Sequence, residues 1–181
     1  MSRPLLLLPL LLVAPLMNGC LLLLGNADPS CPNDGITSDG DVSFGDADRS
    51  AVMDSVNLDA DPTGTCIHAA SITLEFGQGC SISLQADGPM EEMAVYAGSI
   101  FGDEGCGLPA SSFSVQDVGD STISAEGGLF SVGGDDSVCF DGTVHVALDL
   151  VLEDDGVTVP VTGSVTGEGI ELAWFEAGNC P

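Results

Sequence analysis

Alternation of apolar and polar residues with a period of two constrains this chain more than any other feature. It is clearest from Thr143 to Val165, where every second residue from Val144 to Leu152 is apolar. Successive side chains of a β-strand point to opposite faces, so this period indicates a half-buried strand. The sequence Asp154-Asp155-Gly156 interrupts the stretch with a turn signal, and we therefore expect two strands that form a hairpin.

Pro160 lies in the second strand of that hairpin. Proline has no backbone N–H to donate to a sheet, so we expect this strand to be at a sheet edge or bulged.

The same alternation recurs in shorter runs along residues 63–181. Residues 71–76 and 80–86 alternate on either side of Gly77-Gln78-Gly79, which indicates another hairpin. Residues 89–97 fit either a helix opened by Pro89 or a strand from Met93 to Ile100, and we favour the strand. About seven to eight short strands predict an all-β protein, an antiparallel β-sandwich or barrel.

The segment from Asp28 to Pro62 differs from the rest. Its acids are all aspartates, and it contains turn signals such as Asp34-Gly35 and Asp39-Gly40-Asp41 without a sustained period. We therefore expect three regions: a leader over 1–27, an irregular Asp-rich tether over 28–62, and a β domain over 63–181.

Charge excludes whole classes of partner. The chain has two basic residues against 28 acids and a formal net charge of −26. Without a basic patch, neither nucleic acid nor an anionic lipid surface is an electrostatic partner. The apolar content of 44% indicates a folded domain rather than disorder. An acid-rich surface without lysine resembles that of proteins from salty environments, so we expect salt to stabilise the fold by screening.

The N-terminal segment has the features of an export signal, because Arg3 precedes an apolar run over 5–16. The sequence Leu16-Met17-Asn18-Gly19-Cys20 resembles the lipobox of bacterial lipoproteins, in which a small residue precedes a cysteine that becomes lipidated. The resemblance implies cleavage before Cys20 and a lipid anchor on that residue, with the membrane as partner. It covers the leader alone.

Two other interpretations of the leader stay open. Cleavage after Ala27, behind small residues, gives a soluble secreted protein. Retention of residues 5–24 as one uncleaved helix gives a membrane anchor of about the minimum spanning length.

The cysteines agree with export. Of the seven in the chain, those after Cys20 are scattered: Cys31, Cys66, Cys80, Cys106, Cys139 and Cys180. None belongs to a C-x-x-C pair, so neither a zinc knuckle nor a thioredoxin-type redox site is indicated. An even number in an exported chain predicts three structural disulfides, whose connectivity the sequence does not select.

One short sequence has the spacing of a calcium loop. Asp59, Asp61 and Thr63 place oxygen ligands at positions 1, 3 and 5, and Gly64 occupies position 6. Position 12 is Ala70 instead of the usual glutamate. We expect no cofactor, and calcium at these residues is the alternative.

The two histidines, His68 and His145, do not have metal-ligand spacing. We expect both to be exposed side chains.

No motif indicates catalysis. The chain has neither a Gly-x-Ser-x-Gly elbow nor a phosphate-binding loop, and among so many acids a pair of carboxylates carries no information. We expect a non-enzymatic, lipid-anchored cell-envelope or extracellular β-domain with a binding or structural role. Its protein or glycan partner is not identified by the sequence. A calcium-dependent adhesion or matrix module and a secreted hydrolase are the alternatives.

Overall fold

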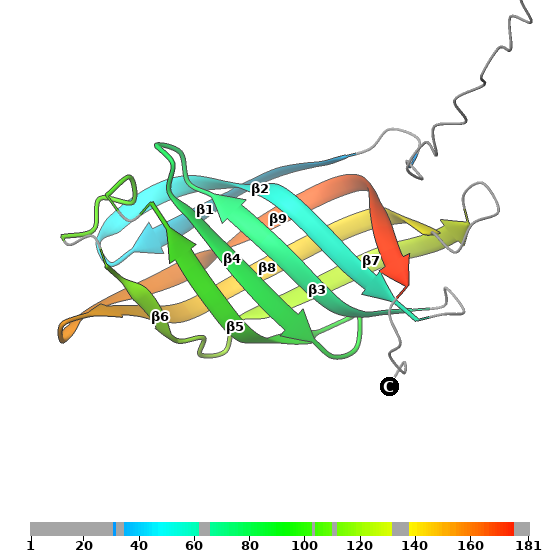
Figure 1. Ribbon diagram of the computed structural model, residues 1–181. Coiled ribbons are helices and arrows are strands. Elements are labelled where there is room, and N and C mark those ends of the chain that lie inside the picture. Colours follow the sequence, from blue (N-terminus) through cyan, green and yellow to red (C-terminus); the bar gives the residue numbers. More distant parts are fainter. Residues whose placement is uncertain are drawn as a thin grey trace, which may run out of the picture.

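The computed structural model describes residues 31, 35–61, 66–102, 104–109, 112–131 and 138–175. This part of the chain contains strands and no helix (Figure 1). The strands are β1 (Gly35–Phe44), β2 (Ala47–Ala60), β3 (Ile67–Glu75), β4 (Ser81–Asp87), β5 (Met93–Phe101), β6 (Ser114–Asp117), β7 (Thr122–Ser131), β8 (Val138–Asp154) and β9 (Val157–Phe175). The predicted all-β fold is confirmed, and so is the strand interpretation of residues 93–100.

The nine strands form one sheet whose pairing returns to its start. Following the pairs from β1 through β2, β3, β4, β5, β7, β8 and β9 leads back to β1, and β6 pairs with β8 alone. Figure 1 shows β2 to β5 crossing in front of β7 to β9, so the closed sheet has two facing layers. The sequence left a sandwich and a barrel open, and the pairing matches the barrel, in which one sheet closes on itself.

Pairing is antiparallel throughout, except for one short contact between β2 and β9. Leu58–Ala60 lies parallel to Ala173–Phe175. Because β1 is antiparallel to both of these strands, β2 and β9 run in the same direction. They pair directly beyond the first residue of β1, where that strand no longer separates them.

The inner faces of the strands supply the core. The five alternate residues of β8 from Val144 to Leu152, which the sequence pattern places on one face, are all buried. In β3 and β4, Ile72, Leu74, Ile82 and Leu84 are fully buried in the same way. The apolar half of the alternating pattern is therefore the interior of the closed sheet.

The tether prediction is wrong for residues 35–60, which form β1 and β2 and bring the strand count to nine. Val42, Phe44, Ala51 and Met53 are buried at alternate positions, so a period of two is present. Short polar residues on the outer face and the aspartate–glycine steps mask this period in the sequence. Residues 32–34 and 62–65 lie outside the described part.

The prediction that Pro160 marks an edge or a bulge is also wrong, because β9 lies between β8 and β1. The carbonyl of Pro160 accepts a hydrogen bond of 2.8 Å from the N–H of Gly45, in the turn that follows β1. A strand residue directs its N–H and its C=O to the same side. The side of Pro160 that lacks an N–H thus faces the turn after β1, beyond Phe44–Val161, the last pair of the β1–β9 ladder.

Glycines lie directly opposite one another on three adjacent strands. Gly127 pairs with Gly142, which pairs with Gly169. The ring of Phe140 covers two of them, because a Cβ atom at Gly127 or Gly142 would lie 2.9 or 2.7 Å from it. Glycine allows the close approach that a sharply curved sheet needs, and an aromatic ring commonly covers the space left.

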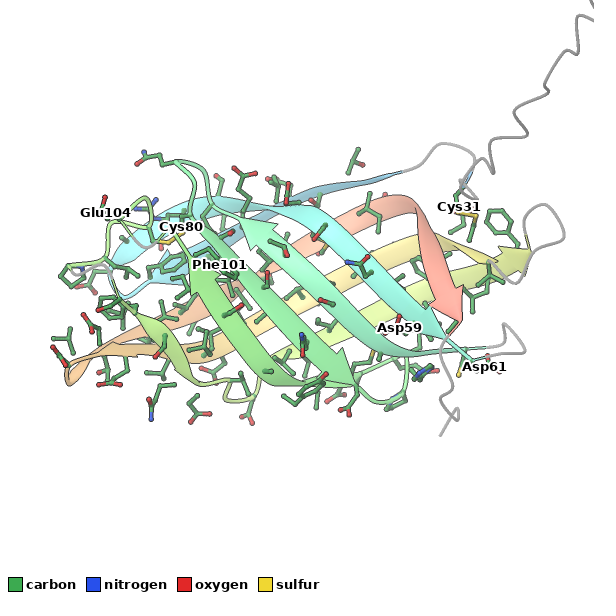
Figure 2. The ribbon with its side chains drawn as sticks, in the orientation of Figure 1. Cys31, Asp59, Asp61, Cys80, Phe101 and Glu104 are labelled. Carbon is green, nitrogen blue, oxygen red and sulfur yellow. A yellow bond between two sulfur atoms is a disulfide. The ribbon has the colours of Figure 1, made fainter. Side chains whose placement is uncertain are left out.

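Disulfides link distant parts of this sheet, as the sequence predicts. Cys31 is bonded to Cys139 of β8, and Cys80 is bonded to Cys106 (Figure 2). Cys66 is disulfide-bonded as well. Cys180 lies outside the described residues.

Candidate functional site

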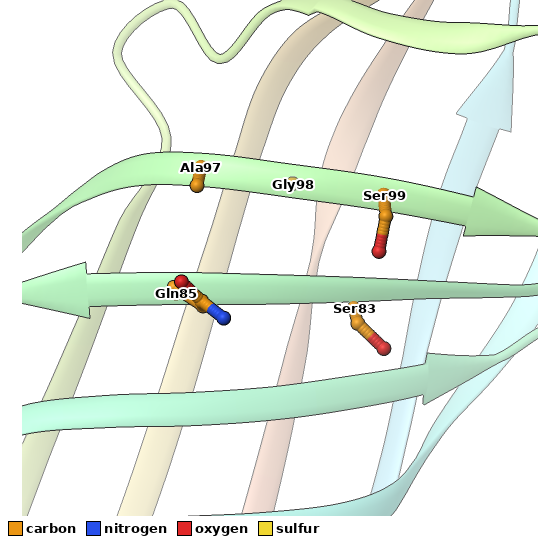
Figure 3. A pocket seen from close by; sticks show the side chains of 5 residues that line it. All are labelled: Ser83, Gln85, Ala97, Gly98 and Ser99. Atoms are coloured by element: carbon orange, nitrogen blue, oxygen red, sulfur yellow. The ribbon is translucent and has the colours of Figure 1, made fainter.

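A depression on the outer face of the sheet, between β4 and β5, is the candidate site. It has a volume of about 190 Å³ and is lined by Ser83, Gln85, Ala97, Gly98 and Ser99 (Figure 3). The alternation of β4 explains this lining. Ser83 and Gln85 face outward, because Ile82, Leu84 and Ala86 are buried in the core. We refer to this feature as the β4–β5 depression.

A β-bulge places the one tyrosine of the chain beside this depression. Gln85 pairs with Ala97 and Ala86 pairs with Val95, so Tyr96 has no partner in the ladder. A bulge redirects the side chain of its extra residue. Tyr96 is 59% exposed, and its hydroxyl donates a hydrogen bond of 3.3 Å to Oε1 of Gln85. The phenol therefore reaches from β5 to β4 along the outer face.

Hydrogen-bonding groups of the depression remain available. The hydroxyls of Ser83 and Thr73 share a hydrogen bond of 2.8 Å. Among the described residues, neither the amide nitrogen of Gln85 nor the hydroxyl of Ser99 has a hydrogen-bond partner. Figure 3 shows both side chains beside the hollow, so a ligand there meets free polar groups.

The depression contains no ionisable side chain, although the chain carries 28 acids. Asp87 ends β4, β5 carries no acid, and Glu75 of the neighbouring β3 pairs with Ser81. The nearest acids on β3 to β5 therefore lie beyond the two ends of the depression. The lining residues offer hydroxyls and an amide, and Tyr96 adds an aromatic ring beside them. They fit the binding of an uncharged polar molecule better than proton transfer or metal binding.

Two further cavities lie elsewhere on the sheet. One of about 320 Å³ lies between the first half of β1 and residues 53–57 of β2, where the two strands separate. There the hydroxyl of Ser38 accepts a hydrogen bond of 2.6 Å from the N–H of Met53, in place of a ladder bond. The other, of about 240 Å³, is lined by the turn after β1, by residues 158–160 of β9 and by residues 106–109.

Arg49 is the only arginine or lysine among the described residues, and its position is structural. Nη1 donates a hydrogen bond of 3.1 Å to the carbonyl of Gly105, and the guanidinium lies 6.0 Å from the ring centre of Phe44. The bond between Cys80 and Cys106 holds the same loop (Figure 2). Arg49 thus fastens this loop over one end of the closed sheet.

The residues of the predicted calcium loop are only partly described. Asp61 is 6% exposed, its Oδ1 accepts a hydrogen bond of 2.9 Å from the N–H of Cys66, and its own N–H donates to the Cys66 carbonyl. Asp61 therefore closes the connection between β2 and β3. Asp59 lies in β2 near it (Figure 2). Thr63 lies outside the described residues, and calcium binding stays a prediction.

No group of three or more histidine, cysteine or acidic side chains is gathered for a metal ion within the described ranges.

The two histidines differ. His145 is exposed, as predicted, and its Nδ1 shares a hydrogen bond of 2.9 Å with Oγ1 of Thr166. His68 is half-buried, so the prediction is wrong for this residue. It is the extra residue of a bulge, because Asp59 and Ala60 pair with Ala69 and Ile67.

The predicted lipidation residue, Cys20, lies outside the described residues. In the part of the chain that is described, no helix is long and apolar enough to cross a bilayer. Comparison with models of protein families, with curated proteins and with solved structures finds no match.

Proposed function

We propose that this protein is an exported β-domain, anchored to the cell envelope by a lipid on Cys20, with a binding or structural role and no catalytic activity. The observation that carries the proposal is the set of buried disulfides. Cys31–Cys139 and Cys80–Cys106 join segments far apart in sequence, and their sulfurs belong to side chains no more than 4% exposed. Such bonds form and persist in oxidising compartments.

The leader adds the second support. The apolar run over 5–16 ends at Gly19-Cys20, the arrangement that resembles the lipobox of bacterial lipoproteins. A lipid on Cys20 would hold a chain with 28 acids at an anionic membrane, since the acyl chains supply an attraction that the protein surface lacks.

The chemistry of the β4–β5 depression supports binding over catalysis. Ser83, Gln85 and Ser99 offer neutral hydrogen-bonding groups, and no base lies among the lining residues to activate a serine. A neutral binding surface on a rigid sheet suits a domain that holds a partner at the envelope.

The test is fractionation of the full chain and of Cys20→Ser in a bacterial host. We expect the wild-type chain in the membrane fraction and Cys20→Ser in the soluble fraction. Cys180→Ser is the control for loss of a cysteine outside the leader. Mass spectrometry of the N-terminal peptide should show a diacylglycerol-type modification on Cys20. A Cys20→Ser variant that still sediments with membranes, or a wild-type chain that is soluble, contradicts the proposal.

A further inference from the structure

We propose that the β4–β5 depression binds a neutral oligosaccharide, with one sugar ring seated over Gly98 and the phenol of Tyr96 as an aromatic platform beside it. This inference rests on the proposed function, because it names the class of partner that the envelope domain holds. It follows from the size, the charge and the polar groups of the depression, together with the aromatic residues at its ends.

The size of the depression selects a small ligand. At about 190 Å³ it is smaller than the roughly 300–1,000 Å³ of pockets that enclose drug-sized molecules. It also lies on the outer face of the sheet, so a longer molecule is free to continue along the surface. One ring of a chain-like ligand fits both properties.

The charge of the protein selects a neutral ligand. The net charge of −26 repels anions, and the lining residues offer no carboxylate to a cation. The ligand must therefore gain its affinity from hydrogen bonds and apolar contact. A neutral sugar ring combines hydroxyls on its rim with C–H groups on its face, and these two kinds of group match the amide, the hydroxyls and the ring found here.

Two of the polar groups of the site, those of Gln85 and Ser83, are positioned before a ligand arrives. Tyr96 holds Oε1 of Gln85, which leaves the amide nitrogen as the donor toward the depression. Ser83 is held by Thr73, and the hydroxyl of Ser99 is free among the described residues to donate or accept. Groups that are already fixed lose little conformational entropy on binding.

Exposed aromatic residues lie at both ends of the depression. Tyr96 is 59% exposed and Phe101 is 57% exposed, and both belong to β5. At about 3.3 Å per strand residue they are roughly 16 Å apart, which leaves room for several linked rings between them. Tyr96 unites an apolar ring with a polar hydroxyl, a combination favoured where one side of a site is apolar and the other wet.

The experiment is isothermal titration of the processed full chain, in detergent, with cellohexaose, maltohexaose and laminarihexaose. We expect saturable binding of at least one of these neutral sugars, with the same affinity at low and high salt because no charge is involved. Hexalysine and oligogalacturonate are the cationic and anionic probes. Binding of either charged probe in place of the neutral sugars, or no binding of any neutral sugar, overturns the inference.

Variants locate the site. Tyr96→Ala should weaken binding of the sugar by about tenfold or more, the loss of one aromatic contact and its area. Phe130→Ala is the matched control, because Phe130 is an exposed aromatic residue of β7. Because Tyr96 is the only tyrosine, bound sugar should also protect the chain from nitration by tetranitromethane. Equal sugar affinity in wild type and Tyr96→Ala contradicts this location.

The fractionation of Cys20→Ser involves no sugar and the titration involves no membrane, so a failure of this inference and a failure of the anchor proposal are observed separately.

Discussion

Replacing Phe140 by alanine should cost far more stability than the same change at Phe130, although the two residues are close in sequence and lie on paired strands. Phe140 is fully buried and its ring covers Gly127 and Gly142, while Phe130 is 37% exposed. Truncation of a buried phenylalanine typically costs about 3–5 kcal/mol, the sum of lost burial and the cavity left behind. We expect the upper half of this range, because the glycines beneath the ring have no side chains to fill the space.

Chemical denaturation measures this difference. At Phe130 the cost should be about 1 kcal/mol or less, since a partly exposed side chain loses little burial. The free energies of unfolding of the two variants should therefore differ by about 3 kcal/mol, or several degrees in melting temperature for a domain of this size. Equal losses at the two positions would show that the ring of Phe140 does not support the glycine contacts, and our account of how the sheet curves would then be wrong.

Two further predictions concern charge and cysteines. Raising sodium chloride from 10 mM to 1 M shortens the screening length to about 3 Å. Thermal melts at constant pH should therefore show a large rise in melting temperature. A constant melting temperature would mean that the acids are too far apart to repel one another. Thiol titration of the denatured, unreduced protein, with Cys20 lipidated or replaced by serine, should detect no free thiol, and two or more would contradict the predicted set of three disulfides.

The sequence predicts strands wherever one face is uniformly apolar, and fails where the pattern is mixed. The alternation of β8 is recognisable because large aliphatic residues occupy each inward position. In β1 the inward positions include Gly40, and in β2 they include Ala51, so the same period is weak. Pro160 misled for a different reason, since its fit depends on where the neighbouring strand ends, which is long-range information.

The candidate site was missed because a bulge and a strand pairing create it. Tyr96 follows Val95, a buried residue, and nothing in the sequence marks it as the extra residue of the ladder. Gln85 is brought to it by the pairing of β4 with β5. The sequence does contain a change of phase in β5, because the inward residues are Met93 and Val95 at first and then Ile100, but this change does not identify which residue is extra. The five disulfide cysteines that are described, in contrast, are predictable from the even number and scattered spacing of the cysteines in a chain with an export signal.

The disulfides and the charge of this protein act on the same equilibrium. Unfolding lets the 28 acids move apart, so mutual repulsion favours the expanded chain. The bonds Cys31–Cys139 and Cys80–Cys106 close loops with sequence separations of 108 and 26 residues. In the chain-entropy model each bond is worth about 3–5 kcal/mol when the other is absent. A crosslinked chain also stays more compact when it unfolds, so its acids remain closer together and less of their mutual repulsion is relieved. The disulfides therefore oppose unfolding twice, through lost chain entropy and through repulsion that is not relieved. Both effects favour the folded state of a domain that has so acidic a surface and a single described arginine or lysine, which itself fastens a loop.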